Sequence, residues 1–359
     1  MKKTIVIIFF GDFFYDARCI NMANSIIDDG HKLYIIDSGS SASQFRGMQI
    51  FHVNVMVDGF YKYVKFFTKT KQLISKIHPT TIIASDLYSL PSACSFKEKN
   101  IIYDSREIYS QHAGMINNKM KQFFWHMIEK IFIKKTNVVL VTADGDKAIL
   151  NKLYNEIKIQ ILYNLPSIKM KMKKENLLRK KINLLNNEKI FLYQGVLHPG
   201  RGIKNMIMLL KEFDDCHGVI IGDGPYKDKI LEFAKKYDLL HRIHMLGRVK
   251  YTQMMKLTVD ADIGFSIIKP ISQSYEQALP NKLFEYALVK VPVICSDLVE
   301  MKQIVNKHKI GISVSYNNMV KQKMVLNELL KNKPKYIKDL KTENLIWENQ
   351  ESKFLQVIY

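Results

Sequence analysis

Apolar runs alternate with amphipathic stretches through the first half of the chain. A continuous apolar run covers Thr4 to Phe10 and ends at Gly11-Asp12. A helical pattern follows from Tyr15 to Asp29, and then a second apolar run covers Lys32 to Asp37. Strand, loop, helix and strand in this order are typical of the opening of a doubly wound parallel sheet. Further β-branched runs predict strands at 81–85, 101–103, 138–142 and 159–163.

The same alternation resumes after a Lys-rich connector at 169–181. Apolar runs there predict a second set of strands, at 190–194, 219–221, 243–246, 261–268 and 291–296. Asn164-Leu165-Pro166 separates the two sets, and 359 residues are enough for two domains with a core each. We therefore predict an α/β protein with one doubly wound domain at 1–165 and another at 166–340.

One stretch of the second half combines a turn, a helix and charged side chains. Residues 280–288 predict a tight turn and then a short amphipathic helix that points Leu283, Phe284 and Ala287 inward. Lys282 and Glu285 share one face near the helix N-terminus, where a phosphate would meet backbone N–H groups and a cation. A carboxylate one turn further in could accept two ribose hydroxyls. The alternative interpretation is a solvated Lys–Glu pair.

The charge balance restricts the kinds of partner. Lysine and arginine number 54 against 34 aspartates and glutamates, which gives a formal net charge of +20. Such a charge favours an anionic partner, namely nucleic acid, an anionic membrane surface or phosphorylated substrates. The alternative is that a Lys- and Ile-rich chain reflects genome composition.

The cysteines and the N-terminus bear on the cellular compartment. The four cysteines lie far apart without a CxxC pattern, at Cys19, Cys94, Cys216 and Cys295. This spacing argues against a zinc site or a disulfide framework and favours a reduced, cytoplasmic protein. The first apolar run is shorter than the h-region of a signal peptide, and no stretch approaches the roughly 20 apolar residues of a membrane span.

Two segments combine basic and aromatic residues. Residues 59–83 contain no acidic residue, and their lysines alternate with aromatic side chains: Lys62, Lys65, Lys69, Lys71 and Lys76 with Phe60, Tyr61, Tyr63, Phe66 and Phe67. A similar segment covers 119–135. Basic amphipathic helices of this kind lie in anionic membrane interfaces. The alternative is a surface helix that buries its aromatic face.

The residues from 280 to 297 resemble a known signature. Pro-Asn-Lys-Leu-Phe-Glu-Tyr-Ala at 280–287, followed by Pro-Val-Ile at 292–294 and Ser-Asp at 296–297, is similar to the donor site of the family 4 nucleotide-sugar glycosyltransferases. The resemblance implies the GT-B fold, with two Rossmann-like domains facing across a cleft. It also implies that residues 341–359, which contain Trp347-Glu348, form a helix that crosses back to the N-terminal domain.

The resemblance implies roles for individual residues. In the family, the second Glu of a Glu, seven residues, Glu motif binds the donor ribose, and Glu285 matches it; the first Glu falls at Gln277, beside Glu276. The implied donor-binding residues are Gly195, Arg201, Gly222, Gly224, Glu276, Asn281, Lys282, Leu283 and Glu285. Those expected to act in catalysis are Arg106, Arg201 and Lys282, where Arg106 replaces a family His in Asp-Ser-Arg-Glu. The acceptor-side residues are Gly11, Asp12, Asp16, Arg18 and Glu107.

The implied activity is a retaining, metal-independent transfer of a sugar from a UDP- or GDP-sugar to an acceptor hydroxyl. The expected acceptor is a saccharide or a lipid-linked molecule of cell-surface polysaccharide or glycolipid biosynthesis, at the inner face of the cell membrane. Asp260 and Asp262 imitate a metal-binding DxD motif, but they precede a buried strand and are expected to cap and flank it. Two alternatives are a nucleotide-sugar epimerase of the same fold and a basic nucleic-acid-binding protein, although we find no nucleic-acid recognition module.

Overall fold

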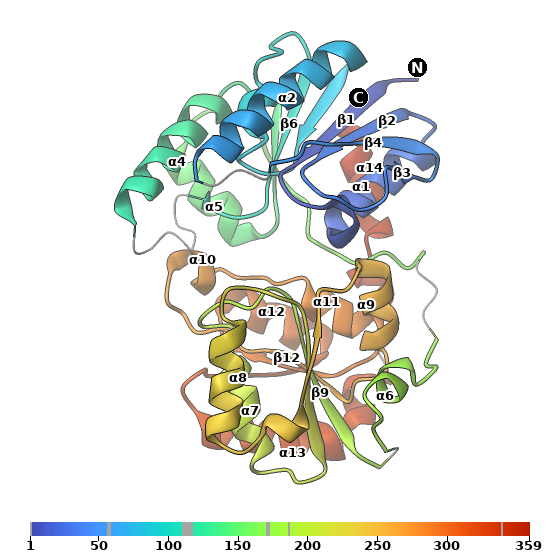
Figure 1. Ribbon diagram of the computed structural model, residues 1–359, viewed down its shortest axis with the longest axis vertical. Coiled ribbons are helices and arrows are strands. Elements are labelled where there is room, and N and C mark those ends of the chain that lie inside the picture. The colour runs from blue at the N-terminus through green and yellow to red at the C-terminus, as the bar shows by residue number, and fades with distance from the viewer. Residues whose placement is uncertain (1, 56–58, 110–117, 170–172, 186, 339) are drawn as a thin grey trace. The chain divides into compact units, whose positions relative to one another are not determined.

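The apolar runs form the strands of two separate parallel sheets (Figure 1). The computed structural model describes every residue except 1, 56–58, 110–117, 170–172, 186 and 339. Its chain divides into two units, one made of residues 1–164 and 350–359 and the other of residues 165–349. Each unit carries one of the sheets, with helices on both faces, which is the doubly wound arrangement that the sequence predicts.

The first unit holds an eight-stranded sheet in the order β3-β4-β2-β1-β5-β6-β7-β8, parallel except for the β3–β4 pair. Its strands are β1 (Thr4–Phe9), β2 (Lys32–Asp37), β3 (Gln44–Phe45), β4 (Met48–His52), β5 (Thr81–Ala84), β6 (Asn100–Ser105), β7 (Val138–Val141) and β8 (Ile159–Ile161). Its helices are η1 (Phe13–Tyr15), α1 (Ala17–Asp28), α2 (Tyr61–Ile77), α3 (Leu90–Ala93), α4 (Lys119–Ile133) and α5 (Asp144–Leu153).

The core of the first unit explains why β1 reads as an unbroken apolar run. Residues Ile5 to Ile8 are all fully buried, because helices cover both faces of the sheet. The helix α2 packs on the sheet through Phe66 and Ile74, and α4 packs through Trp125 and Ile133. The outward faces of these two helices are left to solvent.

The second unit holds a six-stranded sheet in the order β11-β10-β9-β12-β13-β14. Its strands are β9 (Lys189–Gln194), β10 (Cys216–Ile221), β11 (Ile243–Gly247), β12 (Ile263–Ser266), β13 (Val293–Ser296) and β14 (Gly311–Val314). Its helices are α6 (Leu177–Lys181), α7 (Ile203–Leu210), α8 (Lys227–Lys236), η4 (Leu240–Arg242), α9 (Tyr251–Thr258), α10 (Gln273–Glu276), α11 (Lys282–Leu288), α12 (Val299–His308), α13 (Met319–Lys331), η5 (Lys333–Tyr336) and η6 (Thr342–Leu345).

The helix α11 differs from its prediction as an amphipathic helix. Every residue from Lys282 to Ala287 is buried, including the two charged ones. It lies close against β12, where a Cβ added to Gly264 would come within 2.3 Å of the Tyr286 ring. Glycine at 264 therefore makes room for Tyr286, and both faces of α11 become interior.

The last helix, α14 (Glu348–Gln356), is shorter than the predicted helix at 341–359, whose first residues include η6 instead. Residues 350–359 belong to the first unit. Polar side chains of the first unit donate to backbone carbonyl oxygens of residues 350–359, which we call the tail: Lys3 Nζ to Ile358 (2.7 Å), Asn100 Nδ2 to Val357 (3.0 Å) and Gln160 Nε2 to Lys353 (2.9 Å). The tail is thus an integral part of the first unit.

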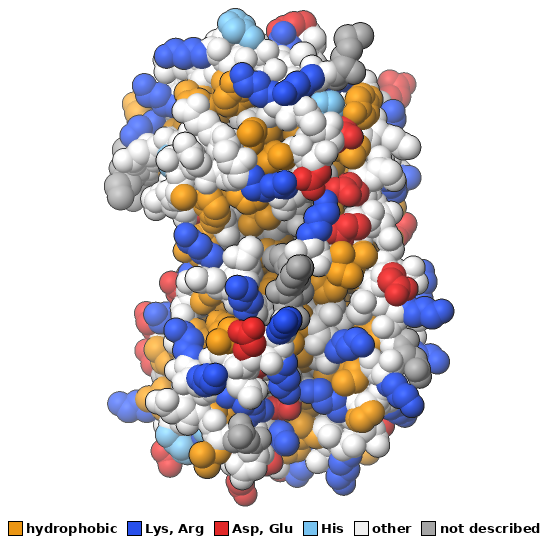
Figure 2. Space-filling model, turned by 90° about the vertical axis from the view of Figure 1, so that its right-hand side faces the viewer, with side chains coloured by type: hydrophobic (Ala, Val, Ile, Leu, Met, Phe, Trp, Pro, Cys, Tyr) orange, Lys and Arg blue, Asp and Glu red, His pale blue; other side chains and the backbone are white. Residues whose placement is uncertain are grey.

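Several elements were not predicted, namely β3, β4 and β14. These strands are short and lie at or next to sheet edges, where partial exposure breaks the apolar run. None of the described helices is both long and apolar enough to span a membrane. Basic side chains are spread over the surface of both units in the view of Figure 2.

Candidate functional site

The loops that follow β9 and β10 lock together through their backbones. Gly195 N donates to Ile221 O (2.9 Å), and Leu197 N donates to Asp223 O (3.0 Å). A Cβ at Gly222 would come within 1.9 Å of Gly195 O, and Gly222 has a φ of +146°. Both features require glycine. The carboxyl ends of β9 and β10 are thereby fixed side by side, at the edge where parallel sheets place ligands.

Arg201 stands at the start of α7, next to this edge. Its guanidinium lies 4.3 Å from the centre of the Tyr275 ring, and its Nε donates to the Tyr275 hydroxyl (3.1 Å). The following residue, Gly202, caps α7 with a φ of +68°, and a Cβ there would meet Ile267 O at 2.5 Å. Stacking on the Tyr275 ring therefore orients the Arg201 side chain, which stays partly exposed.

Lys282 is a buried cation without a carboxylate partner among the described residues. Its Nζ lies 3.7 Å from the centre of the Tyr193 ring, and the residue is 8% exposed. Burial and the positive charge of Arg201 both lower the pKa of Lys282, while Glu285 opposes them. Gly195 is also close, because a Cβ there would lie 3.5 Å from Nζ. Two basic side chains and a glycine turn thus converge, and an anion bound beside them would favour the charged form of Lys282.

Glu285 is held by a polar chain inside the unit. It accepts a hydrogen bond from the Gln194 side-chain amide, and Gln194 Oε1 accepts one from the Thr258 hydroxyl (2.8 Å). Burial raises the pKa of Glu285 to about 7, against the opposing effects of Gln194 and Lys282. Gln194 and Thr258 were not predicted as site residues. Their signal in the sequence is weak, because a single glutamine ends an otherwise apolar strand.

Three consecutive residues of β9 each contact a different residue of α11. Leu192 O accepts from the Tyr286 hydroxyl (2.9 Å), the Tyr193 ring faces Lys282, and Gln194 donates to Glu285. A shift of α11 along the strand would break all three contacts at once. This register places the ammonium and the carboxylate of α11 at the carboxyl end of β9.

Three other residues predicted to bind a donor have different surroundings. Leu283 is fully buried and its N–H donates to Pro280 O (3.1 Å), so its side chain is part of the core. Asn281 starts α11, and its carbonyl accepts from Glu285 N (3.0 Å). Glu276 is exposed on α10 and makes no side-chain hydrogen bond to another described residue. The structure brings together Gly195, Arg201, Gly222, Lys282 and Glu285, and Gly224 joins them through its close approach to Leu197.

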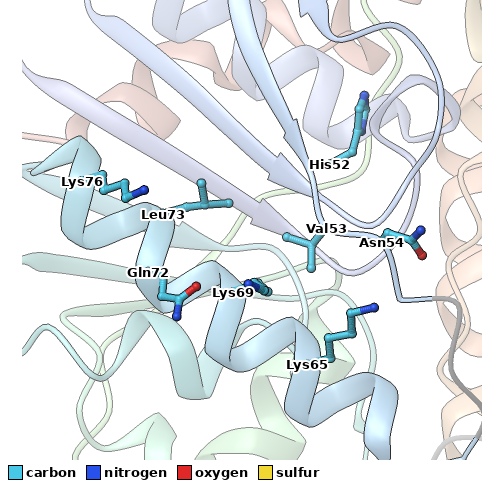
Figure 3. Close-up of a pocket in the computed structure, with 8 residues that line it drawn as sticks. All are labelled: His52, Val53, Asn54, Lys65, Lys69, Gln72, Leu73 and Lys76. Carbon is cyan, nitrogen blue, oxygen red and sulfur yellow. The ribbon is translucent and has the colours of Figure 1, made fainter.

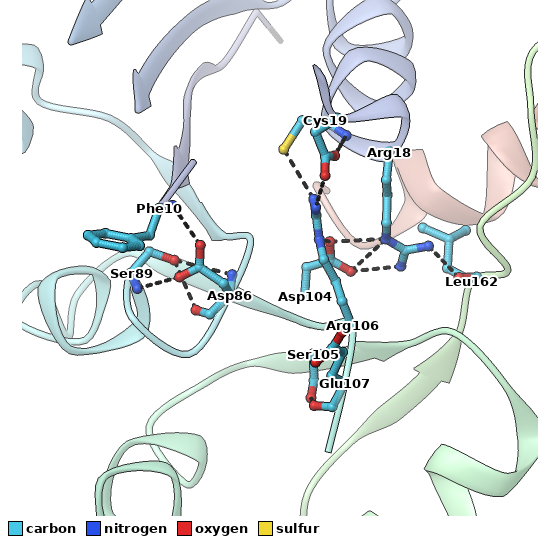
Figure 4. Close-up of polar contacts among 11 residues, drawn as sticks. Phe10, Arg18, Cys19, Asp86, Ser89, Asp104, Ser105, Arg106, Glu107 and Leu162 are labelled. Carbon is cyan, nitrogen blue, oxygen red and sulfur yellow. Dashed lines mark hydrogen bonds and ion pairs between the residues drawn. The ribbon is translucent and has the colours of Figure 1, made fainter. Parts of the chain in front are cut away.

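In the first unit, three protein groups accept hydrogen bonds from the Arg106 guanidinium (Figure 4). Its Nε donates to Asp104 (2.8 Å), its Nη1 to Asp16 (2.5 Å) and its Nη2 to Cys19 Sγ (3.1 Å). Burial alone would lower the pKa of Arg106, but Asp16, Cys19 and Asp104 raise it. Each guanidinium nitrogen thus has a protein acceptor that fixes its position, and a role of Arg106 in catalysis stays a prediction.

Arg18 has a supporting position instead of one at the acceptor surface. It is 1% exposed, and its Nε and Nη2 both donate to Asp104 while Nη1 donates to Leu162 O (2.5 Å). Burial would raise the pKa of Asp104, but the charges of Arg18 and Arg106 lower it. The sequence predicted Arg18 as an acceptor-side residue. In the structure Arg18 instead holds Asp104 in position.

Two more of the predicted acceptor-side residues, Gly11 and Asp12, lie in the loop after β1. Asp12 caps η1 and accepts from the Ser41 hydroxyl (2.7 Å), and Gly11 O accepts from Ser38 N (3.0 Å). Glu107 is half-buried next to Arg106. Figure 4 also shows Asp86, which sequence analysis missed; it accepts from Phe10 N (2.6 Å), and burial raises its pKa.

The aspartates of the DxD-like sequence are engaged by the protein. Asp260 accepts from Leu178 N (2.8 Å), and Asp262 pairs with Arg179 (2.8 Å) and accepts from Ile190 N (2.9 Å). They tie α6 and β9 to the start of β12, as expected for residues that flank a strand. Within the described ranges, no group of three or more His, Cys, Asp or Glu side chains is arranged to hold a metal ion.

Comparisons with known proteins place the site in a family context. Residues 174–344 match the family model described as "Glycosyl transferases group 1". An uncharacterized glycosyltransferase of Methanocaldococcus jannaschii, MJ1059, is 22% identical over 181 residues, which are 47% of this chain and 41% of the relative. A second one from that organism, MJ1607, is 20% identical and covers 84% of this chain and 81% of its own length. The chain thus spans less than half of MJ1059 but most of MJ1607.

Solved structures identify the fold. Sucrose-phosphate synthase from Thermosynechococcus elongatus has a TM-score of 0.81 at 14% identity, covering 99% of this chain and 98% of that one. WaaG, a glycosyltransferase involved in lipopolysaccharide biosynthesis, has a TM-score of 0.76 at 13% identity, covering 98% and 99%. Anabaena HepE in complex with UDP-glucose has a TM-score of 0.77 at 12% identity, covering 99% of both chains. The GT-B fold predicted from the sequence, with two Rossmann-like domains, is confirmed.

The interlocked loops predict a stability effect at Gly222. We expect Gly222→Ala to lower the free energy of unfolding by about 2–6 kcal/mol, because a strained backbone costs about 1–3 kcal/mol and a forced contact adds a similar amount. Urea unfolding measures the change. Gly247→Ala is the control, since Gly247 also has a positive φ (+67°) but no atom within 4 Å of an added Cβ. Equal losses in both variants would contradict a role for the close approach to Gly195.

Proposed function

We propose that this chain is a retaining glycosyltransferase that moves a sugar from a nucleotide-diphosphate sugar to an acceptor hydroxyl. The convergence of Arg201, Lys282 and Glu285 at the carboxyl ends of β9 and β10 carries the proposal, because it lies inside the segment that matches a glycosyltransferase model. The donor would be a UDP- or GDP-sugar. The UDP-glucose complex of HepE, a protein of the same fold, supports this class of donor.

The charges of the site suit a departing diphosphate. Arg201 and Lys282 repel each other, so a diphosphate between them replaces a repulsion with two attractions. As the bond to the sugar breaks, negative charge develops on the leaving phosphate, and preoriented cations stabilise that charge without reorganising. In a retaining reaction of this kind, the leaving phosphate itself takes the proton of the acceptor hydroxyl. No further protein base and no metal ion are then required.

Glu285 would accept hydrogen bonds from the two ribose hydroxyls of the donor. Gln194 already occupies one of its oxygens, so the carboxylate keeps a fixed orientation. A carboxylate is a stronger acceptor than a neutral acid, and donor binding would therefore favour the ionised form of a group whose pKa is about 7.

The acceptor would bind on the first unit, and we place the enzyme at the cytoplasmic face of a membrane. The start of α2 and the helix α4 carry exposed apolar side chains, and the Phe60 and Phe124 rings are 5.3 Å apart. This apolar patch consists of Phe60, Tyr61, Val64, Met120, Phe123 and Phe124, with exposed fractions between 39% and 85%. Exposed apolar patches flanked by lysines are typical of proteins that lie on membranes. An acceptor of polysaccharide or glycolipid biosynthesis fits this location.

A nucleotide-sugar epimerase of the same fold is the alternative for the same donor site. It would convert the donor sugar when incubated without an acceptor, whereas the transferase requires one. Incubation of the protein with UDP-glucose alone separates the two activities.

Glu285→Gln is expected to weaken donor binding about ten- to a hundredfold, as the loss of charge-assisted hydrogen bonds of about 1.5–3 kcal/mol implies. The melting temperature should stay close to that of wild type, because the amide removes a buried charge and keeps the shape. Calorimetric titration at pH 8 keeps Glu285 ionised in the wild type. Glu232→Gln, an exposed carboxylate on α8, is the control. Unchanged donor affinity with a collapsed melting temperature would make Glu285 a structural residue.

Arg201→Ala is expected to reduce turnover about 10²–10³-fold, because one preoriented donor to the developing charge is lost. Donor affinity should fall less than turnover does. Single-turnover rates and donor titrations on the same samples give the comparison, and Arg201→Lys should recover part of the rate. Equal losses of rate and affinity would show a contact made in the ground state only.

The membrane location predicts that wild type sediments with anionic vesicles at low salt and that a variant with Lys62, Lys65, Lys69 and Lys71 changed to Gln does not. Near an anionic surface each lysine contributes about 1 kcal/mol. Binding should weaken steeply with salt, since the Debye length falls from ~10 Å at 0.1 M to ~3 Å at 1 M. A variant with Lys227, Lys229, Lys235 and Lys236 of α8 changed to Gln loses the same charge and is the control. Equal sedimentation of all three proteins would exclude this surface.

A further inference from the structure

A polar pocket lies in the first unit, between the end of β4 and the helix α2 (Figure 3). Its volume is about 390 Å³, within the range of about 300–1,000 Å³ that small-molecule sites occupy. The residues that line it come from two segments: His52, Val53 and Asn54, and from α2 Lys65, Lys69, Gln72, Leu73 and Lys76. None of these lining residues is acidic.

The lysines of this pocket carry charge that the described residues do not neutralise. Lys65, Lys69 and Lys76 lie along one side of α2, facing the segment of His52 to Asn54 in Figure 3. None of the three forms an ion pair with a described carboxylate. Lysines four residues apart on a helix repel each other and destabilise it. An anion in the pocket would turn this repulsion into attraction.

Two arginines of the same unit are paired internally. Arg18 and Arg106 are paired with Asp16 and Asp104, so that cluster has no excess of positive charge. Asp37, which contacts the pocket residue His52, is fully buried and accepts from His52 Nδ1 (2.6 Å), Phe13 N (3.0 Å) and Gly39 N (3.1 Å). Asp37 is therefore engaged by His52 and by backbone N–H groups and is not available to the lysines.

We propose that this pocket binds a phosphate or diphosphate group. The ammonium groups of Lys65, Lys69 and Lys76 are compact donors for phosphate oxygens, and the amide of Gln72 adds neutral donors. Val53 and Leu73 supply an apolar part of the wall. The identity of the ligand rests on the proposed transferase activity. Given that activity, the acceptor is a phosphorylated saccharide or lipid, and this pocket binds its phosphate.

Methyl NMR of the whole chain with inorganic pyrophosphate tests the pocket directly. Val53 and Leu73 line it, so their methyl resonances should shift in a saturable manner. Binding at the proposed donor site would instead shift methyl groups of the second unit, such as those of Leu197. No shift of Val53 and Leu73 overturns the proposal, whatever happens at the second unit.

A pair of charge-matched variants separates a site from general attraction. Lys65→Gln with Lys69→Gln removes two lysines of the pocket, and Lys62→Gln with Lys71→Gln removes two lysines of α2 that do not line it. The first variant should raise the pyrophosphate dissociation constant measured at Val53 and Leu73 at least about tenfold. The second should change it less than about twofold. Equal changes in both would show that only the net charge of α2 matters, and the proposal would fail.

Vesicles of phosphatidic acid distinguish a lipid headgroup from a soluble phosphate. If the pocket takes the headgroup, pyrophosphate releases wild type from these vesicles but leaves residual binding of the pocket variant unchanged. If the pocket takes a soluble phosphate, adding pyrophosphate does not change the binding of wild type to vesicles, while the methyl shifts of Val53 and Leu73 persist. Either result supports a phosphate site. A separate titration with UDP-glucose, followed at Leu197, tests the donor site, so failure of the proposed function leaves the pocket result standing.

Discussion

Burying a lysine and a glutamate on one short helix is the constraint on which the second unit depends. Each charged group loses its hydration, and the protein must supply partners at fixed places. Strand β9 supplies them in sequence, as a carbonyl for Tyr286, a ring for Lys282 and an amide for Glu285. The strand and the helix are therefore fixed in one register. The contacts that hold the candidate site therefore also fix α11 against β9.

The apolar runs predicted most of the fold because strands buried on both faces need unbroken apolar sequence. The runs at 4–10 and 32–37 became β1 and β2 with little change at their ends. Strand β14 was missed because Gly311–Val314 is a short edge strand without such a run. The helix α11 was predicted as amphipathic, since a polarity pattern treats Lys282 and Glu285 as facing solvent. Only the surrounding fold shows that both are buried.

The predicted site residues differ in how far away in the sequence their contact partners lie. Gly195, Arg201, Lys282 and Glu285 follow strands or start helices, so a short motif was enough to bring them together. Arg106 depends on Asp16, which lies 90 residues earlier, and no local pattern indicates that pairing. The same holds for Gln194, whose partner Glu285 is 91 residues away. Long-range pairs of polar side chains are the part of the site that a single sequence conceals.

The tail at 350–359 has a consequence for how the chain is made. Ribosomes release a chain from its N-terminus, so residues 1–164 emerge while the carbonyl groups that Lys3, Asn100 and Gln160 contact have not yet been synthesised. The whole second unit is translated before the first can form its final contacts. During that interval the first unit lacks the contacts of residues 350–359, and we expect it to be less stable than in the finished chain.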